Sequence, residues 1–215
     1  RWNAIYFSFI IKTWTEKLIS WNIKGKDVDT IIDKVKLKEL IKENMPYLIK
    51  DLERLVSVPS IRDLDTKREG APFGENIRKA FDEFLDIAKR EGFKTEDFNG
   101  YAAHAEIGQG DEFIGVLGHL DVVPIFNPDQ WHSNPFKMEK RNEFLYGRGV
   151  NDDKGPVLAA LYAVKILKEL NVDMKRKIRI IVGGAEETTW ECMKYYFSKN
   201  PQPVYGFSPD GDFPI

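Results

Sequence analysis

The stretch PVLAALYAVKILKELNVDMKRKIRIIVGG (residues 156–184) decides the class of fold. Its first part, PVLAALYAVKILKEL, is apolar on almost every side and begins with proline, which suits the first turn of a buried helix. Its last part, KIRIIVGG, is a short apolar run rich in β-branched residues, as expected of a buried strand. Buried helices that alternate with buried strands are typical of an α/β protein whose sheet is partly parallel.

Three further segments have the patterns of helices. Apolar residues recur at helical spacing over 46–57, where Pro46 suits the first turn, and over 77–88, where Gly92 follows as a stop. A third helix is expected over 186–199, with acidic residues at its start. The sheet is therefore expected to have helices packed against it.

The remaining strands are predicted from alternation and from apolar runs. The alternating run 101–108, a polar turn and the apolar run 113–123 predict a hairpin that leads into a buried strand. A second hairpin is expected within 136–147, and a strand over 203–208. The expected fold class is α/β, with a mixed sheet flanked by helices.

The bulk composition is that of an ordinary soluble protein. The chain has 215 residues, 42% of them hydrophobic, which is enough for one substantial core or two small ones. Its 32 basic and 34 acidic residues give a net charge of −2, which argues against a nucleic acid or an anionic membrane as partner. A single cysteine, Cys192, excludes an internal disulfide and fits a reducing compartment such as the cytoplasm.

Residues 1–30 are interpreted as an N-terminal appendage, separate from the portion 31–215. The apolar stretch 4–11 is interrupted by Lys12, so it is too short for a membrane-spanning helix, and no signal-peptide cleavage site is evident. Two interpretations of the appendage stay open. It is either an extension outside the fold or an amphipathic helix for a partner or a membrane surface.

Four loops that leave apolar strands or open helices carry acidic or imidazole side chains. They are GHLDVVP (118–124), GRGVNDDKGP (147–156), GGAEETTW (183–190) and FSPDGD (207–212). Sites in α/β proteins assemble at strand ends, so the four loops together indicate a functional site.

Each loop also has a purely structural interpretation. His119 and Asp121 could be a hydrogen-bonded pair at a strand end, and Asp152 could belong to a helix N-cap. Glu186 and Glu187 could form an acidic first turn, and Asp210 fits a turn. Taken together, however, one histidine and several carboxylates would be an unpaired negative cluster unless a cation lay among them.

A divalent metal ion is the cation that these residue types favour. Imidazole nitrogen and carboxylate oxygen, without thiolate, suit Zn²⁺, Mn²⁺ or Co²⁺. Residues i and i+2 of a strand share a face, so Asp121 can accept a hydrogen bond from one ring nitrogen of His119 while the other nitrogen holds metal.

The motifs resemble those of the dinuclear metallopeptidases that include aminoacylases, carboxypeptidase G, carnosinase and dipeptidases. The resemblance runs from about residue 35 to residue 215 and rests on HLDVVP, then Trp131, Pro135 and Phe136, then YGRGVNDDKGP, EETTW and FSPDGDFPI. The forms DDKGP, EETTW and SPD most resemble the bacterial dipeptidase V branch. The first 30 residues lie outside it.

The resemblance implies a role for each residue of the cluster. It implies that Asp152 bridges two metal ions, Zn²⁺ in the first instance, and that His119 and Asp210 complete one site. It implies Glu187 as a ligand of the other metal, Glu186 as the general base that deprotonates a metal-activated water, and Asp121 as the residue that orients His119. It also implies a cis peptide bond between Asp152 and Asp153.

The chain is shorter than dipeptidases of this branch, which carry an inserted lid domain and a last histidine ligand near the C-terminus. The sequence is therefore expected to be a truncated catalytic domain without lid, in which the second metal site lacks its histidine. His104 and His132 are the other histidines, and an ordinary structural role is expected for both.

These observations predict metal-dependent hydrolysis of dipeptides or short peptides, in a chain incomplete for full activity. Two alternatives stay open: an inactive metal-binding fragment or pseudoenzyme, and an amidohydrolase acting on N-acyl amino acids. A small peptide is the expected partner, and the sequence leaves the oligomeric state unknown.

Overall fold

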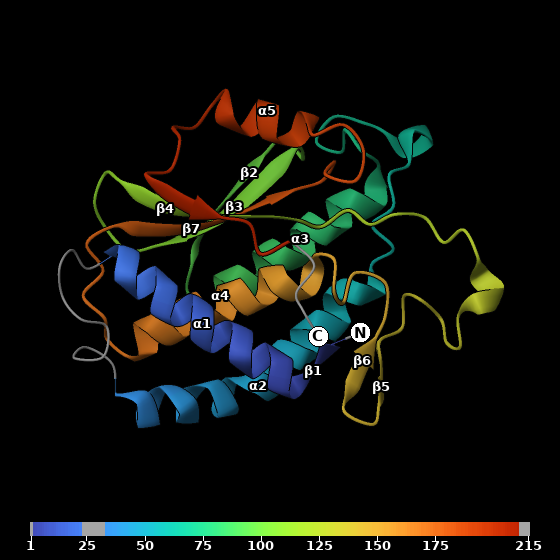
Figure 1. Ribbon diagram of the computed structural model, residues 1–215. Helices are drawn as coiled ribbons and strands as arrows, with labels where there is room; N and C mark the ends of the chain where they lie inside the picture. Colours follow the sequence, from blue (N-terminus) through green and yellow to red (C-terminus); the bar gives the residue numbers. More distant parts are fainter. Residues whose placement is uncertain (1, 23–32, 211–215) are drawn as a thin grey trace.

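The computed structural model describes residues 2–22 and 33–210, and its centre is a five-stranded sheet (Figure 1). The strand order is β2-β3-β7-β4-β8. β3 is antiparallel to β2 and to β7, whereas β4 is parallel to β7 and to β8. The predicted mixed sheet is therefore confirmed, with the strands β2 (Lys94–Phe98), β3 (Ala102–Ile107), β4 (Phe113–His119), β7 (Lys177–Gly183) and β8 (Tyr205–Phe207).

The hairpin predicted for 101–123 is wrong. β7 lies between β3 and β4, so these two strands are close in sequence but do not pair. The loop between them passes over the start of β7, where the amide of Lys177 donates to the carbonyl of Glu112 over 3.2 Å. Gly108 and Gly110 adopt φ values of 98° and 103°, which permits this course. The turn-like composition of the loop is thus explained by a crossing rather than by a hairpin.

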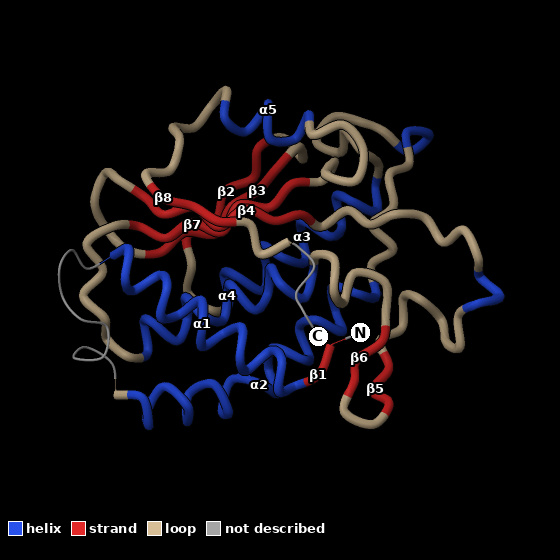
Figure 2. Tube along the Cα trace, viewed as in Figure 1, coloured by secondary structure: helices blue, strands red, loops and turns tan. Residues whose placement is uncertain are grey.

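Helices cover both faces of the sheet (Figure 2). One face carries α1 (Ala4–Asn22), α2 (Lys34–Ser57), α3 (Glu75–Arg90) and α4 (Lys154–Glu169), and the other carries the short α5 (Glu191–Phe197). The predicted helices over 77–88 and 156–170 are confirmed as α3 and α4. The smaller sheet β1-β6-β5 consists of β1 (Trp2–Asn3) and the predicted hairpin of β5 (Glu139–Arg141) and β6 (Phe144–Tyr146).

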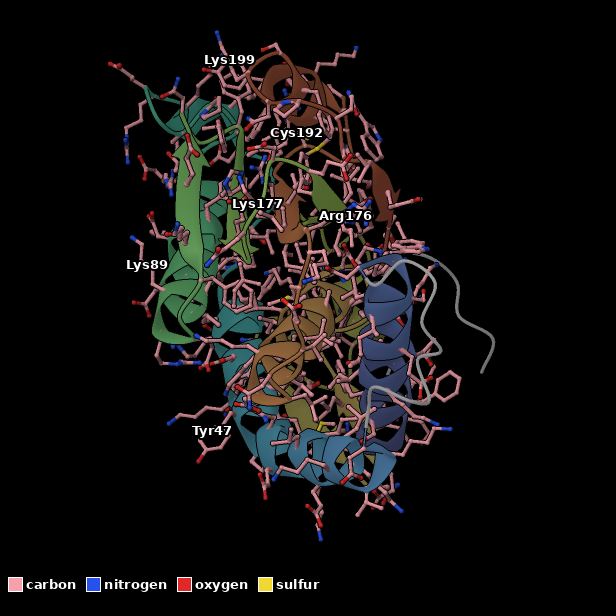
Figure 3. The ribbon with its side chains drawn as sticks, turned by 90° about the vertical axis from the view of Figure 1, so that its left-hand side faces the viewer. Tyr47, Lys89, Arg176, Lys177, Cys192 and Lys199 are labelled. Carbon is pink, nitrogen blue, oxygen red and sulfur yellow. The ribbon has the colours of Figure 1, made fainter. Side chains whose placement is uncertain are left out.

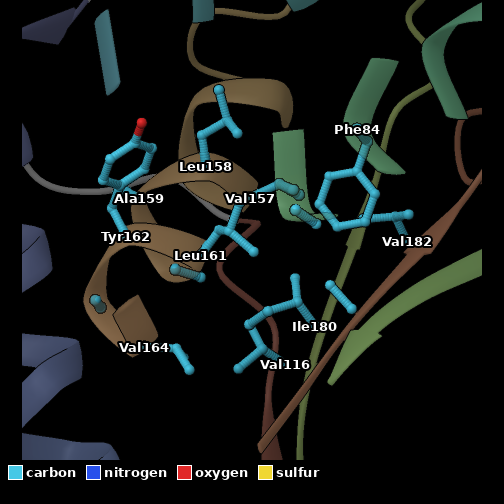
Figure 4. Packing of buried hydrophobic residues seen from close by; sticks show 14 of the residues in the cluster. Phe84, Val116, Val157, Leu158, Ala159, Leu161, Tyr162, Val164, Ile180 and Val182 are labelled. Atoms are coloured by element: carbon cyan, nitrogen blue, oxygen red, sulfur yellow. The ribbon is translucent and has the colours of Figure 1, made fainter. Parts of the chain in front are cut away.

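The core lies between α4 and the sheet (Figure 4). Val157 and Leu161 of α4 face Val116 of β4 and Ile180 of β7, and Phe84 of α3 closes the layer. All these side chains are buried, as the apolar character of α4 predicted. Burial of a side chain of this size is worth about 1.5–3 kcal/mol, so this layer is a main source of stability.

Of the two interpretations of the N-terminal appendage, an extension outside the fold is wrong for the described residues 2–22. α1 packs against α4 and α2 and buries six large apolar side chains: Phe7, Ile10, Ile11, Trp14, Leu18 and Ile19. The physical reason is that α4 is apolar all round, so the side turned away from the sheet also needs a cover. Residues 23–30 of the predicted appendage lie outside the described residues.

Asn22, the last residue of α1, ties this helix to the start of β7. Its side-chain amide donates to the carbonyl of Arg176 over 3.1 Å, and its side-chain oxygen accepts from the amides of Lys175 and Arg176. The Arg176 side chain lies beside the end of the helix (Figure 3) and donates to the carbonyl of Trp21 over 3.0 Å. Asn22 is buried, so these groups depend on one another for hydrogen bonds.

α2 is longer than predicted and α5 is shorter. α2 begins at Lys34, where the side chain of Asp33 caps the amides of residues 35 and 36, and Pro46 lies inside the helix instead of in its first turn. α5 begins at Glu191, so Glu186 and Glu187 belong to the loop that precedes it. The acidic residues are therefore not the first turn of a helix, and another reason for them is required.

The described helices include none that is long and apolar enough to cross a lipid bilayer.

Replacing Asn22 with alanine tests the attachment of α1. The variant leaves one buried amide, one partly buried amide and one carbonyl without their partner, so Asn22→Ala is expected to lower the free energy of unfolding by about 1–3 kcal/mol. Ser20→Ala is the matched control, because Ser20 is exposed in the same helix and bonds only to its own turn. Urea unfolding measures both, and equal stability of the two variants would contradict this role of Asn22.

Candidate metal centre

The acidic and imidazole side chains meet at one edge of the sheet. His119 is the last residue of β4 and lies level with Gly183 at the end of β7, because the two strands are parallel. Glu186 and Glu187 follow β7 directly, and Asp210 follows β8. The amino-terminal end of α4 brings Asp152 to the same place.

The cluster is centred on Nε2 of His119. This nitrogen lies 3.0 Å from a carboxylate oxygen of Asp152, 3.7 Å from one of Glu186 and 3.8 Å from one of Asp210. Two sets of potential ligands have their donor atoms within 4.8 Å of one another. One consists of His119, Asp152 and Glu187, and the other of His119, Glu186 and Asp210.

This grouping differs in part from the one that the family resemblance implied. Asp152 and Glu187 lie together, as implied for one metal ion. Asp210 lies with His119, also as implied, but their third neighbour is Glu186 instead of Asp152. Glu186 is thus placed where it could either bind a cation or accept a proton.

Asp121 joins the loop after β4 to the loop after β7. Its two carboxylate oxygens accept hydrogen bonds from the amides of Glu186 and Glu187, at 3.2 and 3.1 Å. Nδ1 of His119 lies 3.0 Å from the main-chain carbonyl of Asp121 and 3.4 Å from its carboxylate. The sequence indicated the contact with His119 but not the fixing of the two glutamates, which a pattern of residue types does not reveal.

The protonation of the cluster reflects its excess of negative charge. Burial lowers the pKa of His119, but the carboxylates of Asp121 and Asp152 outweigh it and raise that pKa to about 12. Burial, and next the charge of Asp152, raise the pKa of Glu187 to about 7, and burial also raises the pKa of Glu186. The surroundings therefore favour the protonated form of His119, Glu186 and Glu187 in the absence of a cation.

The arrangement of His119 fits a divalent cation. Within residues 2–22 and 33–210, Nε2 is buried without a hydrogen-bond partner of suitable geometry, although carboxylate oxygens surround it. In the neutral ring with its proton on Nδ1, which can donate to the Asp121 carbonyl, the lone pair of Nε2 would point to a cation among those oxygens. One imidazole nitrogen among several carboxylate oxygens is a donor set that suits Zn²⁺, Mn²⁺ or Co²⁺.

Asp153 supports the strand that carries His119. Its carboxylate is fully buried and accepts a hydrogen bond from the amide of His119 over 3.1 Å. Gly118 makes this approach possible, since a Cβ atom there would lie 2.5 Å from the Asp153 carboxylate. The peptide bond between Asp152 and Asp153 is cis, as the resemblance implied.

Lys154 has a role that the sequence did not reveal. Its fully buried ammonium group donates to the carbonyls of Leu55 and Val58, at 2.9 and 2.7 Å, at the end of α2. Lys154 thereby attaches the α4 end of the cluster to α2, through two carbonyls that also accept from the main-chain amides of Val58 and Ser60.

Neither of the other two histidines belongs to the cluster. His104 lies in β3, where Nδ1 is 2.9 Å from the hydroxyl of Tyr196, and His132 lies in an exposed loop. The structural role expected for His104 agrees with this packing.

The chain is similar in sequence to a known protein family and in fold to solved structures. Residues 115–212, a little under half of the chain, match Peptidase family M20/M25/M40. "Putative dipeptidase YtjP" of Bacillus subtilis is 44% identical over 168 residues, which cover 78% of this chain and 36% of that protein. The chain thus spans about a third of the length of this relative.

Two solved structures have a similar fold. Human carnosine dipeptidase 1 superposes with a TM-score of 0.61 and 24% identity, over 75% of this chain and 36% of its own. The di-peptidase Dug1p from Saccharomyces cerevisiae gives 0.64 and 20%, over 77% of this chain and 37% of its own. The sheet and its helices are therefore an arrangement found in larger proteins.

The burial of His104 predicts a specific effect of pH on stability. Burial, and next the charge of Arg179, lower its pKa to about 4, against roughly 6.5 for an unfolded chain. Between these values the unfolded chain takes up a proton that the folded protein does not, so stability falls as the pH decreases from about 6.5 to 4. The slope from this residue is about 1.4 kcal/mol per pH unit.

Nuclear magnetic resonance titration of the His104 ring checks this value directly. The ring is expected to stay neutral down to about pH 5 in the folded protein. The variant His104→Gln is expected to lose this part of the pH dependence of unfolding. Protonation of His104 near pH 6.5 would contradict the effect of burial.

Proposed function

We propose that this chain belongs to Peptidase family M20/M25/M40 and is the N-terminal portion of the catalytic domain of a metal-dependent dipeptidase, of the dipeptidase V branch. Residues 31–215 would form this portion. The observation that carries the proposal is the convergence of four carboxylates on one buried imidazole nitrogen, at the carboxyl edge of a parallel strand pair. The similarity to proteins named dipeptidases supports the choice of substrate.

Each residue of the cluster would have its own role in metal binding. In this proposal His119, Asp210 and Asp152 would hold one metal ion, and Glu187 together with the same Asp152 would hold the other. Zn²⁺ is the first choice, and Mn²⁺ or Co²⁺ would fit the same donors. When bound, such ions supply a Lewis acid that polarises the scissile carbonyl and lowers the pKa of a water molecule.

Glu186 is the proposed general base. Its carboxylate lies 3.7 Å from Nε2 of His119, at the edge of the cluster, and is only partly buried, so a water molecule can reach it. Burial raises its pKa, which makes it a better proton acceptor than an exposed glutamate. The proton taken from water would then pass to the amine that leaves.

Asp121 is proposed to position both functions. Its carboxylate accepts hydrogen bonds from the amides of Glu186 and Glu187, and its main-chain carbonyl faces His119. Asp121 therefore fixes the position of the proposed base relative to the proposed ligands. A metal site depends on such supporting groups for the orientation of its ligands.

A second candidate function is metal binding without turnover. It is favoured by one observation: within residues 2–22 and 33–210, the two sets of potential ligands share the single histidine His119. Two metal ions bound side by side would compete for this nitrogen. Metal titration together with an activity assay separates the two functions.

Calorimetric titration with Zn²⁺ and Mn²⁺, followed by an assay of dipeptide hydrolysis, tests the roles. Glu186→Gln is expected to lower the rate by about 10²–10⁴-fold and to leave metal affinity nearly unchanged, because it removes a base. His119→Ala is expected to abolish tight metal binding. Glu43→Gln, an exposed residue of α2, is the control and should match the parent protein.

Alanyl-alanine and N-acetylalanine serve as the two substrates. Each is assayed with the 215-residue chain and with a version extended to the length of its relatives. Hydrolysis of N-acetylalanine alone would replace the dipeptidase by an amidohydrolase. If Glu186→Gln weakened metal binding as strongly as His119→Ala, Glu186 would be a ligand and not the base. Metal binding without hydrolysis in either version would favour the second function.

A further inference from the structure

A pocket of about 340 Å³ adjoins the cluster on the side of Glu187. Glu187 and Asp121 form its wall towards the cluster, and its other walls are largely apolar. The apolar side chains come from two loops, and they are Ile61, Leu64, Val122, Val123 and Pro124. None of the proposed roles of the cluster requires this apolar space.

We propose that this pocket is the subsite for an apolar side chain of the peptide substrate. The inference rests on the proposed function and deepens it, since it names the class of substrate that the cluster would cleave. Dipeptides with an aliphatic or aromatic residue beside the scissile bond would be preferred over those with glycine or a charged residue there.

The space around the cluster is unequal on its two sides. The recess on the Glu186 side, which His119 and Asp210 also line, has a volume of about 10 Å³. That is about the smallest space that holds one water molecule. The Glu187 side is more than thirty times larger, so the side chain of a substrate fits there and the water fits beside the proposed base.

The size of the pocket points to one side chain. Sites for small molecules are commonly about 300–1,000 Å³, and this pocket lies near the lower limit. It has room for a single residue and not for a longer peptide. A charged side chain would lose its hydration among apolar walls, whereas an apolar one gains from leaving water.

The loops that form the pocket are held in place by hydrogen bonds. The amide of Val122 donates to the carbonyl of Ser60 over 3.0 Å, and the hydroxyl of Ser60 donates to the carbonyl of Leu120 over 2.6 Å. These bonds join the loop after α2 to the loop after β4. The apolar walls are therefore preformed, as is usual for a binding site.

Arg62 holds the remaining wall. Its guanidinium group donates to the hydroxyls of Thr188 and Thr189, at 2.9 and 3.2 Å, and to the carboxylate of Glu191 at 2.9 Å. It also lies 5.4 Å from the ring centre of Phe73. These contacts engage the guanidinium group, so Arg62 builds the pocket instead of attracting an acidic side chain into it.

A lysine at position 64 tests the subsite. Leu64 belongs to the short 3-10 helix η2 (Leu64–Thr66) and is 54% exposed, so Leu64→Lys changes the pocket without removing a core residue. Phe126→Lys is the matched control, because Phe126 is 77% exposed in a neighbouring loop and does not line the pocket. Urea unfolding verifies that both variants fold like the parent.

The kinetic measurement compares leucyl-glycine, glycyl-leucine and glycyl-glycine, with metal present and in the full-length version of the chain. The parent is expected to cleave at least one leucine dipeptide with a kcat/KM about tenfold or more above that for glycyl-glycine. Leu64→Lys should remove most of this preference. Phe126→Lys should keep both the preference and the rate on glycyl-glycine.

A binding measurement in the chain as given needs no activity. The methyl signals of Ile61, Val122 and Val123 are followed by nuclear magnetic resonance while leucyl-glycine or glycyl-leucine is added to metal-free protein. Saturable shifts that glycyl-glycine does not cause, and that Leu64→Lys abolishes, support the subsite. Absence of any such shift overturns it.

The two measurements separate the subsite from the activity. Equal rates for all three dipeptides, without methyl shifts, overturn the subsite and leave the proposed dipeptidase intact. Selective methyl shifts without hydrolysis of any dipeptide overturn the proposed activity and support the pocket as a binding site for apolar side chains.

Discussion

The burial of α4 between the sheet and two other helices explains both the position of the candidate site and the packing of the N-terminal segment. This helix connects β4 to β7, and because it packs on one face of the sheet, the two strands run parallel and end at the same edge. His119 and the two glutamates meet for that reason. The opposite side of α4 is covered by α1 and α2, which explains why the N-terminal segment is part of the core.

The cluster at this edge is a problem of charge as much as of geometry. Several carboxylates share a partly buried space with a single imidazole. Burial raises the pKa of Glu186 and of Glu187, and the charges of neighbouring carboxylates add to this rise. A divalent cation would offset these charges. The carboxylates of Asp121 and Asp153 accept hydrogen bonds from main-chain amides of the cluster, and Lys154 donates to the end of α2. These bonds keep the ligands close together even where their charges repel.

Sequence patterns predicted the elements better than their partners. The spacing of apolar residues located α3, α4 and β7, because the buried faces of an element require apolar residues at regular positions. The choice of which strands pair with each other requires no such pattern. β3 and β4 looked like a hairpin, but β7 enters between them. Pro46 looked like a helix start, although the helix begins at Lys34. Burial of Leu37 and Ile41 outweighs the lost hydrogen bond of the proline.

Residue patterns alone were enough to predict the class of fold and the residue types of the candidate site. The candidate residues were identified from their places at strand ends and helix starts, because sites in α/β proteins assemble at strand ends. They are His119, Asp121, Asp152, Glu186, Glu187 and Asp210. Only the tertiary structure decided which of these residues are neighbours, and that Asp121 holds the main chain of both glutamates. The same is true of Lys154 and Arg62. Their partners lie about 100 or more residues away in the chain, and contacts over such separations depend on packing, which no local pattern encodes.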